Sequence, residues 1–331
     1  TSIHLYIYLK MAHKIAQNTF RSTFKVVNKD IINWFPGHMG LGLKQMQQKL
    51  KLVDLIIEVH DARIPLTGRN ENFKHTISTI KPHILILNKK DLTDKSYNSK
   101  VIKKIHNEEN IKHVIYTNCK DQQCTGIKQL MPLAQKLIVQ SDRFNRADNK
   151  EFCIMVIGVP NVGKSSIINV LRNRCLKKKG ATQVGAIAGI TRSVLNRIKI
   201  SEDPLIYLLD TPGILMPNIK DTEMGMKLAL CSCLQDHLVG PVNIADYLLY
   251  WMNKNKNFTY MDLFDIKEPC DDIGKVLLAG ATHLNKTIIR KRYDNYLIQI
   301  PDLEAAAIHM IKAFRTGQFG YVLLDNNLVT K

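Results

Sequence analysis

Nearly continuous apolar runs recur along the first two thirds of the chain, and polar or amphipathic stretches separate them. Such runs are typical of strands that are buried on both faces of a sheet. They cover residues 53–63, 83–88, 112–118, 152–158 and 205–210. Stretches at 40–52, 97–107 and 126–140 instead repeat apolar residues at helical spacing. The alternation predicts an α/β fold, with a mostly parallel sheet and helices on both of its faces.

The pattern changes after about residue 222, where the strand-like runs fade. The stretches MKLALCSCLQDHL, VNIADYLLYWMNK and IPDLEAAAIHMIKAFRTG have the apolar spacing of helices. The polar stretch SDRFNRADNK, residues 141–150, has the composition of a linker. We therefore expect a basic tail over residues 1–30, an α/β domain over 31–222 and a smaller, mainly α-helical domain over 223–331.

The charge balance narrows the choice of partner. Lys and Arg total 47 against 29 for Asp and Glu, which gives a net charge of +18. Such an excess favours an anionic partner, either nucleic acid or an acidic membrane surface. No apolar run approaches the roughly 20 residues of a membrane-spanning helix. The seven cysteines form no C-x-x-C pair, so we expect a reducing compartment and no disulfide framework.

The first 29 residues contain no Asp or Glu, and Ser and Thr are interspersed with apolar residues. The basic residues of this stretch are Lys10, Lys14, Arg21, Lys25 and Lys29. This composition is typical of a mitochondrial transit peptide. A disordered basic tail is the alternative. The transit peptide predicts residence in the mitochondrial matrix, with a peripheral position at the inner membrane left open.

The stretch GVPNVGKSS, residues 158–166, fits the phosphate-loop pattern G-x-x-x-x-G-K-[ST] between a predicted strand and a predicted helix. Its glycines let backbone N–H groups close around phosphates at the start of the helix. Lys164 would reach the β- and γ-phosphates, and Ser165 would bind magnesium. The candidate phosphate-binding residues are Asn161, Val162, Gly163, Lys164, Ser165 and Ser166.

The stretch DTPG ends the apolar run LIYLLD and supplies a candidate magnesium loop. Asp210 at the strand end can hold magnesium through water, and the N–H of Gly213 can meet the γ-phosphate. Thr191 lies between the two motifs in AIAGITRS, and its hydroxyl could close onto the same magnesium ion.

The stretch NKKD, residues 88–91, follows another apolar run and is a candidate guanine-reading loop. The carboxylate of Asp91 accepts hydrogen bonds only, so it suits the N1–H and exocyclic amine of guanine and rejects adenine. Asn88 would brace the base loop, and the stem of Lys89 would cover the ring. Residues 117–119, Thr-Asn-Cys, occupy the place of a further base-contacting loop, in which Asn118 and Cys119 are the candidate contacts.

In this chain the base loop precedes the phosphate loop, the reverse of their order in an ordinary GTPase. A circular permutation explains the order, because the ends of compact domains often lie close together. Residues 141–150 would then join the old ends. The motifs predict GTP as the substrate and magnesium as the cofactor.

Further motifs carry a family resemblance over residues 32–325. They are WFPGHM (34–39), DARIPL (61–66), NKKD, GVPNVGKSS, GIT (189–191), DTPG and the closing stretch FRTGQFGYVLLD (314–325). Together they resemble the circularly permuted GTPases of the YlqF/RbgA type, which assist assembly of the large ribosomal subunit, and an organellar branch of that family in particular. The resemblance implies GTP hydrolysis and a helical C-terminal domain that touches ribosomal RNA. It further implies a large mitochondrial ribosomal subunit as partner, a role in mitochondrial translation, and a monomer away from the ribosome.

The group that positions the attacking water is not the usual glutamine, because Ile214 follows the magnesium-loop glycine. The resemblance makes His38 the candidate for that role, and its alternatives are capping of the next helix or contact with RNA. Asn161 matches the position at which the family is thought to hold a potassium ion. A GTP-binding scaffold without turnover and a tRNA-directed GTPase remain alternative functions.

The stretch NKTIIRKRYDN, residues 285–295, is the best candidate for an RNA-facing patch. Its cations are Lys286, Arg290, Lys291 and Arg292. A solvated basic helix is the alternative interpretation.

Overall fold

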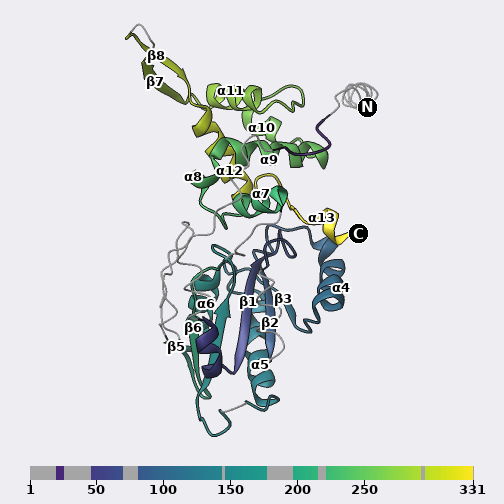
Figure 1. The fold of residues 1–331 in the computed structure, drawn as a ribbon, viewed down its shortest axis with the longest axis vertical. Helices are drawn as coiled ribbons and strands as arrows, with labels where there is room; N and C mark the ends of the chain where they lie inside the picture. The colour runs from purple at the N-terminus through teal and green to yellow at the C-terminus, as the bar shows by residue number, and fades with distance from the viewer. Residues whose placement is uncertain are drawn as a thin grey trace. The chain divides into compact units, whose positions relative to one another are not determined.

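The computed structural model describes residues 20–25, 46–69, 81–143, 146–176, 197–214, 221–291 and 295–330. The chain divides into two compact units (Figure 1). One unit contains residues 30–238 and 320–331, and the other contains residues 1–29 and 239–319. We call the first the GTP-site unit and the second the helical unit, and describe each by itself.

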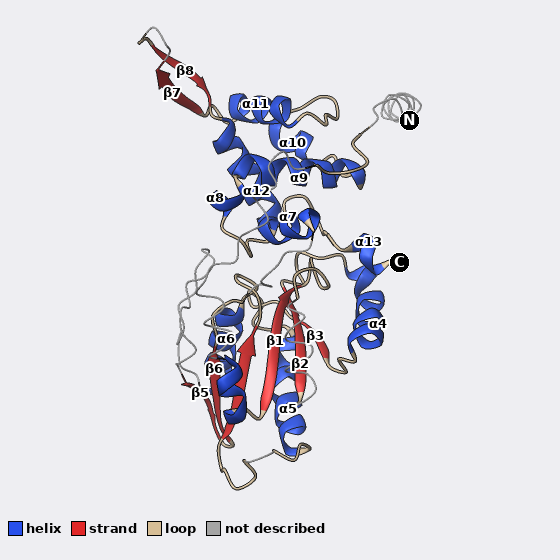
Figure 2. Cartoon of the chain, viewed as in Figure 1, coloured by secondary structure: helices blue, strands red, loops and turns tan. Residues whose placement is uncertain are grey.

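A six-stranded sheet with the strand order β3-β2-β1-β4-β6-β5 forms the centre of the GTP-site unit (Figure 2). Its strands are β1 (Leu55–Asp61), β2 (His83–Asn88), β3 (Val114–Tyr116), β4 (Phe152–Ile157), β5 (Arg197–Glu202) and β6 (Leu205–Asp210). The first four strands and β6 are parallel to their neighbours, and β5 pairs antiparallel with β6. The predicted mostly parallel α/β fold is confirmed, and the carboxyl ends of four buried strands meet at one edge.

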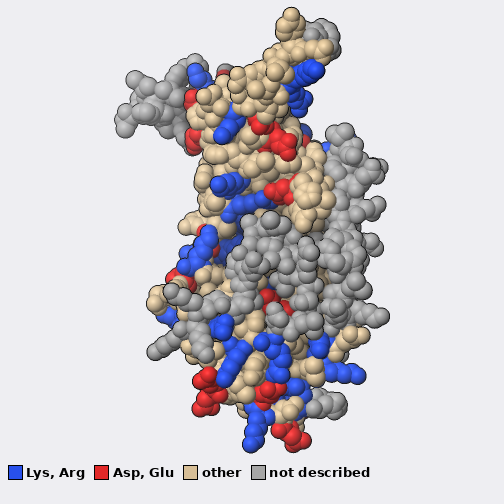
Figure 3. Space-filling model, turned by 90° about the vertical axis from the view of Figure 1, so that its left-hand side faces the viewer, with Lys and Arg blue, Asp and Glu red and all other residues tan. Residues whose placement is uncertain are grey.

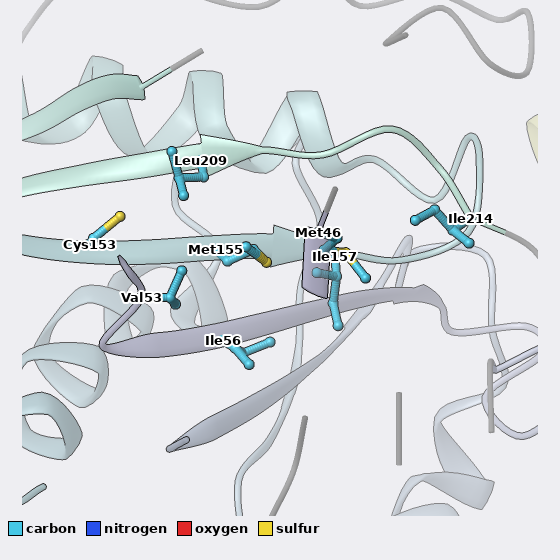
Figure 4. Close-up of a cluster of buried hydrophobic side chains, with 8 residues drawn as sticks. All are labelled: Met46, Val53, Ile56, Cys153, Met155, Ile157, Leu209 and Ile214. Carbon is cyan, nitrogen blue, oxygen red and sulfur yellow. The ribbon is translucent and has the colours of Figure 1, made fainter. Parts of the chain in front are cut away.

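Helices and loops enclose this sheet. Those of the GTP-site unit are η2 (Leu50–Leu52), η3 (Lys95–Tyr97), α4 (Asn98–Glu109), α5 (Thr125–Val139), α6 (Lys164–Leu176), α7 (Thr222–Leu230), α8 (Asp236–Val239) and α13 (Asn326–Val329). Ile56 of β1 and Met155 of β4 pack with Met46 and Ile214 in one apolar cluster (Figure 4). The cluster runs along the sheet from Val53 and Cys153 at the start of the strands to Ile157 and Ile214 at the end where the nucleotide motifs lie.

The helical unit contains α9 (Pro241–Lys254), α10 (Tyr260–Phe264), α11 (Ile273–His283) and α12 (Leu303–Thr316). It also contains an antiparallel hairpin of β7 (Thr287–Lys291) and β8 (Leu297–Pro301). Tyr247, Tyr260 and Phe264 are buried in its core. None of the helices in the described ranges is long and apolar enough to cross a membrane.

The division between the units differs from the boundaries that we predicted. Residues 223–238 and 320–331 group with the GTP-site unit and not with the helical one. The physical reason for the second segment is direct pairing, because the N–H of Val322 donates to Leu92 O and that of Leu324 donates to Arg63 O. Helical periodicity alone gave no sign of these contacts.

Of the predicted tail over residues 1–30, the structure describes residues 20–25, and these contact the helical unit. Arg21 donates to the carboxylate of Asp246 at 2.7 Å and pairs with Asp271 at 3.1 Å. The ring of Phe24 packs edge-on against Tyr247, with centroids 5.1 Å apart. Residues 20–25 are therefore packed into the helical unit, and the transit-peptide assignment stays a prediction.

Candidate nucleotide-binding site

The phosphate loop turns sharply between β4 and α6. Gly158 and Gly163 have φ of +144° and +102°, and Asn161 between them has φ of +57°. A Cβ on Gly163 would lie 2.2 Å from Nδ2 of Asn88, and one on Gly158 would lie 2.1 Å from Val59 O. Both positions therefore require glycine. The turn places the start of α6 where its backbone N–H groups suit an anion.

Lys164, the first residue of α6, is buried. Its Nζ donates to Gly158 O at 3.1 Å and to Val159 O at 2.9 Å. Burial lowers the pKa of Lys164 to about 8, and the nearby carboxylate of Asp210 opposes that shift. A phosphate anion in the loop would favour the charged ammonium further, so the loop is suited to a polyphosphate.

Asp210 ends β6 beside the phosphate loop. Its Oδ2 accepts a hydrogen bond from the hydroxyl of Ser165 at 3.4 Å, while Oδ1 is buried without a hydrogen-bond partner in the part of the chain that the structure describes. Burial raises the pKa of Asp210, and the ammonium of Lys164 opposes that shift. The hydroxyl of Ser165 and the carboxylate of Asp210 therefore fit magnesium, because this ion prefers oxygen ligands. Thr191, the third predicted ligand, lies outside the described residues.

The magnesium loop lies directly against the phosphate loop. The N–H of Ile214 donates to Gly158 O at 3.2 Å. A Cβ on Gly213 would lie 2.6 Å from the backbone of Pro160. Gly213 is therefore required for this close approach. The approach places the N–H of Gly213, the candidate γ-phosphate contact, beside the phosphate loop.

Asn88 connects the base loop with two other loops. Its Nδ2 donates to Val162 O at 2.8 Å, and its Oδ1 accepts from the hydroxyl of Thr117 at 3.0 Å and from Sγ of Cys119 at 3.3 Å. The structure thus brings Asn88, Cys119 and Val162 together. Thr117 belongs to the predicted base-contacting loop, but its hydrogen bond to Asn88 is a feature that our sequence analysis missed.

Asn118 makes hydrogen bonds within its own loop, and its predicted contact with the base stays a prediction. Its side-chain oxygen accepts a hydrogen bond from the N–H of Lys120 at 2.9 Å, and its backbone N–H donates to Sγ of Cys124 at 3.3 Å. The side chain of Asn118 therefore stabilises the turn of its own loop, and Cys119 makes the contact with Asn88.

Lys89 and Asp91 occupy the turn that follows β2. Lys89 has φ of +62°, and its Nζ lies 2.9 Å from Oδ2 of Asp61. Although burial opposes it, the charges of Arg63 and Lys89 hold the pKa of Asp61 well below its usual value. The side chain of Asp91 is 30% exposed, and Lys120 lies at 4.0 Å from it. The carboxylate of Asp91 is therefore accessible to a base.

The Asp61–Arg63 pair is the second feature that sequence reasoning missed. The Arg63 guanidinium donates to both carboxylate oxygens of Asp61, at 3.0 and 2.8 Å, and both residues are buried. We use DARIPL in the family resemblance and do not pair Asp61 with Arg63 from the sequence. Two opposite charges directly after a buried strand were the available signal, but nothing local indicated that Lys89 would join them.

Two of the predicted RNA-facing cations, Arg290 and Lys291, lie on strand β7 of the hairpin, so the alternative of a basic helix is wrong for this part of the stretch. Arg290 pairs with Ile298 and Lys291 with Leu297 across the hairpin. Successive strand residues point to opposite faces, so these two cations do not form one flat patch. Lys286 precedes β7. Arg292 and the candidate water-positioning residue His38 lie outside the described residues.

Comparison with known proteins agrees with this geometry. A family model described as a 50S ribosome-binding GTPase matches residues 153–273. Mitochondrial GTPase 1 of Aedes aegypti is 64% identical over 311 residues, which are 94% of this chain and 98% of that protein. Mitochondrial ribosome-associated GTPase 1 of Bos taurus is 48% identical over 315 residues, 94% and 93% of the two chains.

Among solved structures, GNP-bound YlqF from T. maritima matches with a TM-score of 0.52 and 22% identity, over 84% of this chain and 94% of that one. This likeness concerns the fold. The phosphate loop, the strand-end aspartate and the preceding base loop define a circularly permuted P-loop GTPase. The extent and identity of the matches then settle the family. The chain belongs to the mitochondrial GTPase 1 family, and as a member it binds and hydrolyses GTP. The family resemblance predicted from the motifs is confirmed.

Proposed function

We propose that this GTPase acts on the large subunit of the mitochondrial ribosome as an assembly factor, and that it regulates mitochondrial translation in this way. One observation carries the proposal. The circularly permuted chain forms a GTP site, and relatives in its family are named mitochondrial ribosome-associated GTPases. The basic balance of the chain supports an RNA partner.

At the catalytic centre, Lys164 stabilises the charge on the transferred phosphoryl group, and the N–H of Gly213 contacts the γ-phosphate. Ser165, Thr191 and Asp210 hold magnesium, which supplies electrostatic stabilisation of the phosphates when bound. His38 positions the attacking water. Backbone N–H groups of Val162, Gly163 and Ser166 complete the phosphate contacts.

A potassium ion beside the phosphates is part of the proposal. Asn161 donates from Nδ2 to Ser232 O at 2.9 Å, which fixes the amide group in its place on the phosphate loop. Hydrolysis should then be faster in potassium than in sodium salts, and Asn161→Ala should reduce that difference. Equal rates of the wild type in both salts would remove potassium from the mechanism.

The hairpin is our candidate for the contact with ribosomal RNA. An isolated two-stranded hairpin is only marginally stable, yet Ile289, Tyr296 and Leu297 are about seven-tenths exposed on this one. A partner that covers both faces explains such exposure. Because Arg290 and Lys291 point to opposite faces, the hairpin suits insertion between phosphate backbones.

The sequence between the strands favours RNA over a lipid surface. Residues 292–295 read Arg-Tyr-Asp-Asn, whereas a hairpin that enters a membrane needs apolar residues at its tip. Lys and Arg side chains are also spread over the face of the molecule shown in Figure 3. We therefore place the RNA contact at Lys286, Arg290, Lys291 and Arg292.

Sedimentation of the tagged protein from mitochondrial lysate tests the proposal. With a non-hydrolysable GTP analogue the protein should travel with the large subunit, and with GDP it should remain mostly free. Binding should weaken steeply with salt, because phosphate contacts release counterions. Sedimentation with tRNA or with the small subunit, or no dependence on the nucleotide, would contradict it.

Charge reversal tests the hairpin. Arg290→Glu with Lys291→Glu should weaken subunit binding and reduce the log–log salt slope by about 2, since each lost phosphate contact accounts for about 0.9. The matched control is Lys267→Glu with Lys275→Glu, which changes the same net charge at exposed positions of the same unit. Equal loss in both variants would mean that only net charge matters.

The N-terminal segment bears on where the protein acts in the cell. We propose that the protein acts in the mitochondrial matrix and that the segment removed on import ends before Phe20, because Arg21 and Phe24 are packed into the helical unit. N-terminal sequencing of the mature protein tests this, and a start beyond Arg21 would contradict it. Extraction at alkaline pH would show whether any inner-membrane association is peripheral.

A further inference from the structure

The guanine-reading turn, Lys89–Leu92, is held from two sides. The N–H of Leu92 donates to Lys89 O at 2.9 Å and closes the turn around Asp91. On one side the N–H of Lys90 donates to Thr117 O at 3.0 Å. On the other side Leu92 O accepts from the N–H of Val322 at 3.0 Å. Asp91 thus lies in a turn that depends on the far end of the chain.

The segment that supplies this contact is the C-terminal return, which we define as residues 320–330. Besides the bond of Val322, the N–H of Leu324 donates to Arg63 O at 2.8 Å. Leu323 and Val329 are buried in the apolar cluster that includes Leu85 of β2. The C-terminal return therefore bridges the guanine-reading turn and the loop after β1, whose Asp61 pairs with Lys89.

Asp325 fixes the C-terminal return in place. Its side chain is fully buried, and Oδ2 accepts from the backbone N–H groups of Leu66 at 2.9 Å and Thr67 at 2.8 Å. Oδ1 accepts from the hydroxyl of Thr67 and from Nζ of Lys227 at 3.1 Å. A buried carboxylate with this many donors has one allowed position, so it defines the path of the backbone from Val322 onward.

Lys227, which donates to Asp325, connects the C-terminal return with a further part of the site. It is buried on α7, the first helix that the structure describes after the magnesium loop. The Lys227–Asp325 pair therefore connects the segment that follows the magnesium loop with the segment that supports the guanine-reading turn.

We propose that the C-terminal return is part of the guanine site, and that Val322 and Asp325 are positioning residues which hold Asp91 in place for the base. The inference rests on the guanine-reading role proposed for Asp91. In this role neither residue needs to contact the nucleotide. They determine where the guanine-reading turn lies. Loss of the Asp325 carboxylate should therefore lower discrimination between bases more than it lowers affinity for the phosphates.

The ratio of the dissociation constants for IDP and GDP measures this placement. IDP lacks only the exocyclic amine that Asp91 reads, so the wild-type ratio should be about 10 to 100, the worth of one hydrogen bond to a charged group. The ratio does not depend on the fraction of protein that is folded. Asp325→Ala should reduce it at least about threefold, because small misplacements are costly to directed contacts.

Two further variants separate positioning from stability. Thr67→Val removes one donor to Asp325 without leaving a charge unpaired, so it should fold and reduce the ratio in the same direction, by less than Asp325→Ala. Val329→Ala is the matched control, because it removes buried methyl groups from the same segment and leaves the hydrogen bonds in place. It should lower the unfolding temperature and leave the ratio unchanged.

The outcomes distinguish this inference from the proposed function. If Asp91→Asn abolishes the preference for GDP while Asp325→Ala and Thr67→Val keep the wild-type ratio, the C-terminal return is only structural and the inference is wrong. If Asp91→Asn itself keeps the ratio, the guanine-reading assignment fails first.

Discussion

The two ends of the nucleotide site are built differently. At the guanine end, Asn88 makes hydrogen bonds to three groups of the protein, and Lys89 pairs with a buried carboxylate. At the phosphate end, Lys164 donates to two loop carbonyls, and within the described ranges one oxygen of Asp210 is buried without a hydrogen-bond partner. The protein itself supplies the hydrogen-bond partners at the proposed guanine end, whereas the phosphate end keeps buried polar groups that a triphosphate and magnesium would pair with.

This difference separates two properties of the enzyme. Base preference should depend on contacts within the protein and should change little with the state of the phosphate end. Affinity for phosphates and turnover should depend on buried charge and therefore on pH and metal. Variants at each end should accordingly change different measurements.

Lys164→Ala should give the largest effect, because it removes the cation that faces the transferred phosphoryl group. We expect the single-turnover rate of GTP hydrolysis to fall on the order of 10³-fold. The ratio of the dissociation constants for IDP and GDP should remain within about twofold of the wild type, because the substitution leaves the contacts at the guanine end unchanged. A rate near that of the wild type would show that Lys164 does not act on the phosphates.

His38→Ala should lower kcat about 100-fold, the usual contribution of one positioned acid–base group. Its effect on GTP affinity should be small, because the side chain acts on water and not on the bound nucleotide. Stopped-flow binding and phosphate release measure the two quantities separately. A parallel fall in affinity and rate would make His38 a structural residue.

Asp91→Asn should act at the other end. We expect GTP affinity to fall about 10- to 100-fold, the range for a hydrogen bond to a charged group. Xanthosine triphosphate should now bind, because its extra oxygen accepts from the new amide. The turnover of bound nucleotide should remain close to that of the wild type. If the wild type binds ATP as tightly as GTP, the base assignment is wrong.

The pH dependence gives the smallest effect. Burial lowers the pKa of Lys164 to about 8, and bound phosphates favour the protonated form. Binding therefore takes up a proton above this pKa, and GTP affinity should fall about fivefold from pH 8 to pH 9 while it changes little below pH 7. Lys164→Arg should lose the dependence, because a guanidinium does not titrate in this range. An unchanged affinity in the wild type would contradict the assignment.

The contrast between the two ends also explains what sequence reasoning could predict. Each nucleotide motif is a short contiguous stretch at the end of an apolar run. For this reason NKKD, GVPNVGKSS and DTPG could each be identified from the sequence. The supports of the guanine end come from distant segments, such as Val322 against Leu92. No periodicity in the sequence indicates which distant carbonyl a backbone N–H will find.

Two further differences have the same kind of cause. The edge strand β5 was missed because only Ile198 and Ile200 are buried and hydrophobic in it, between polar residues, so no continuous apolar run marked it. The strand around Arg290 was not predicted at all. Its apolar residues are at most partly buried, and Ile289 is seven-tenths exposed, so no buried apolar run marked it.

The most direct test of this account is to measure GDP and IDP affinities with magnesium and with a chelator. The account predicts that removal of magnesium weakens both nucleotides and leaves their ratio unchanged, because Asn88, Lys89 and Asp91 are held by the protein alone. A ratio that collapses when magnesium is removed would contradict it, since base recognition would then depend on the phosphate end.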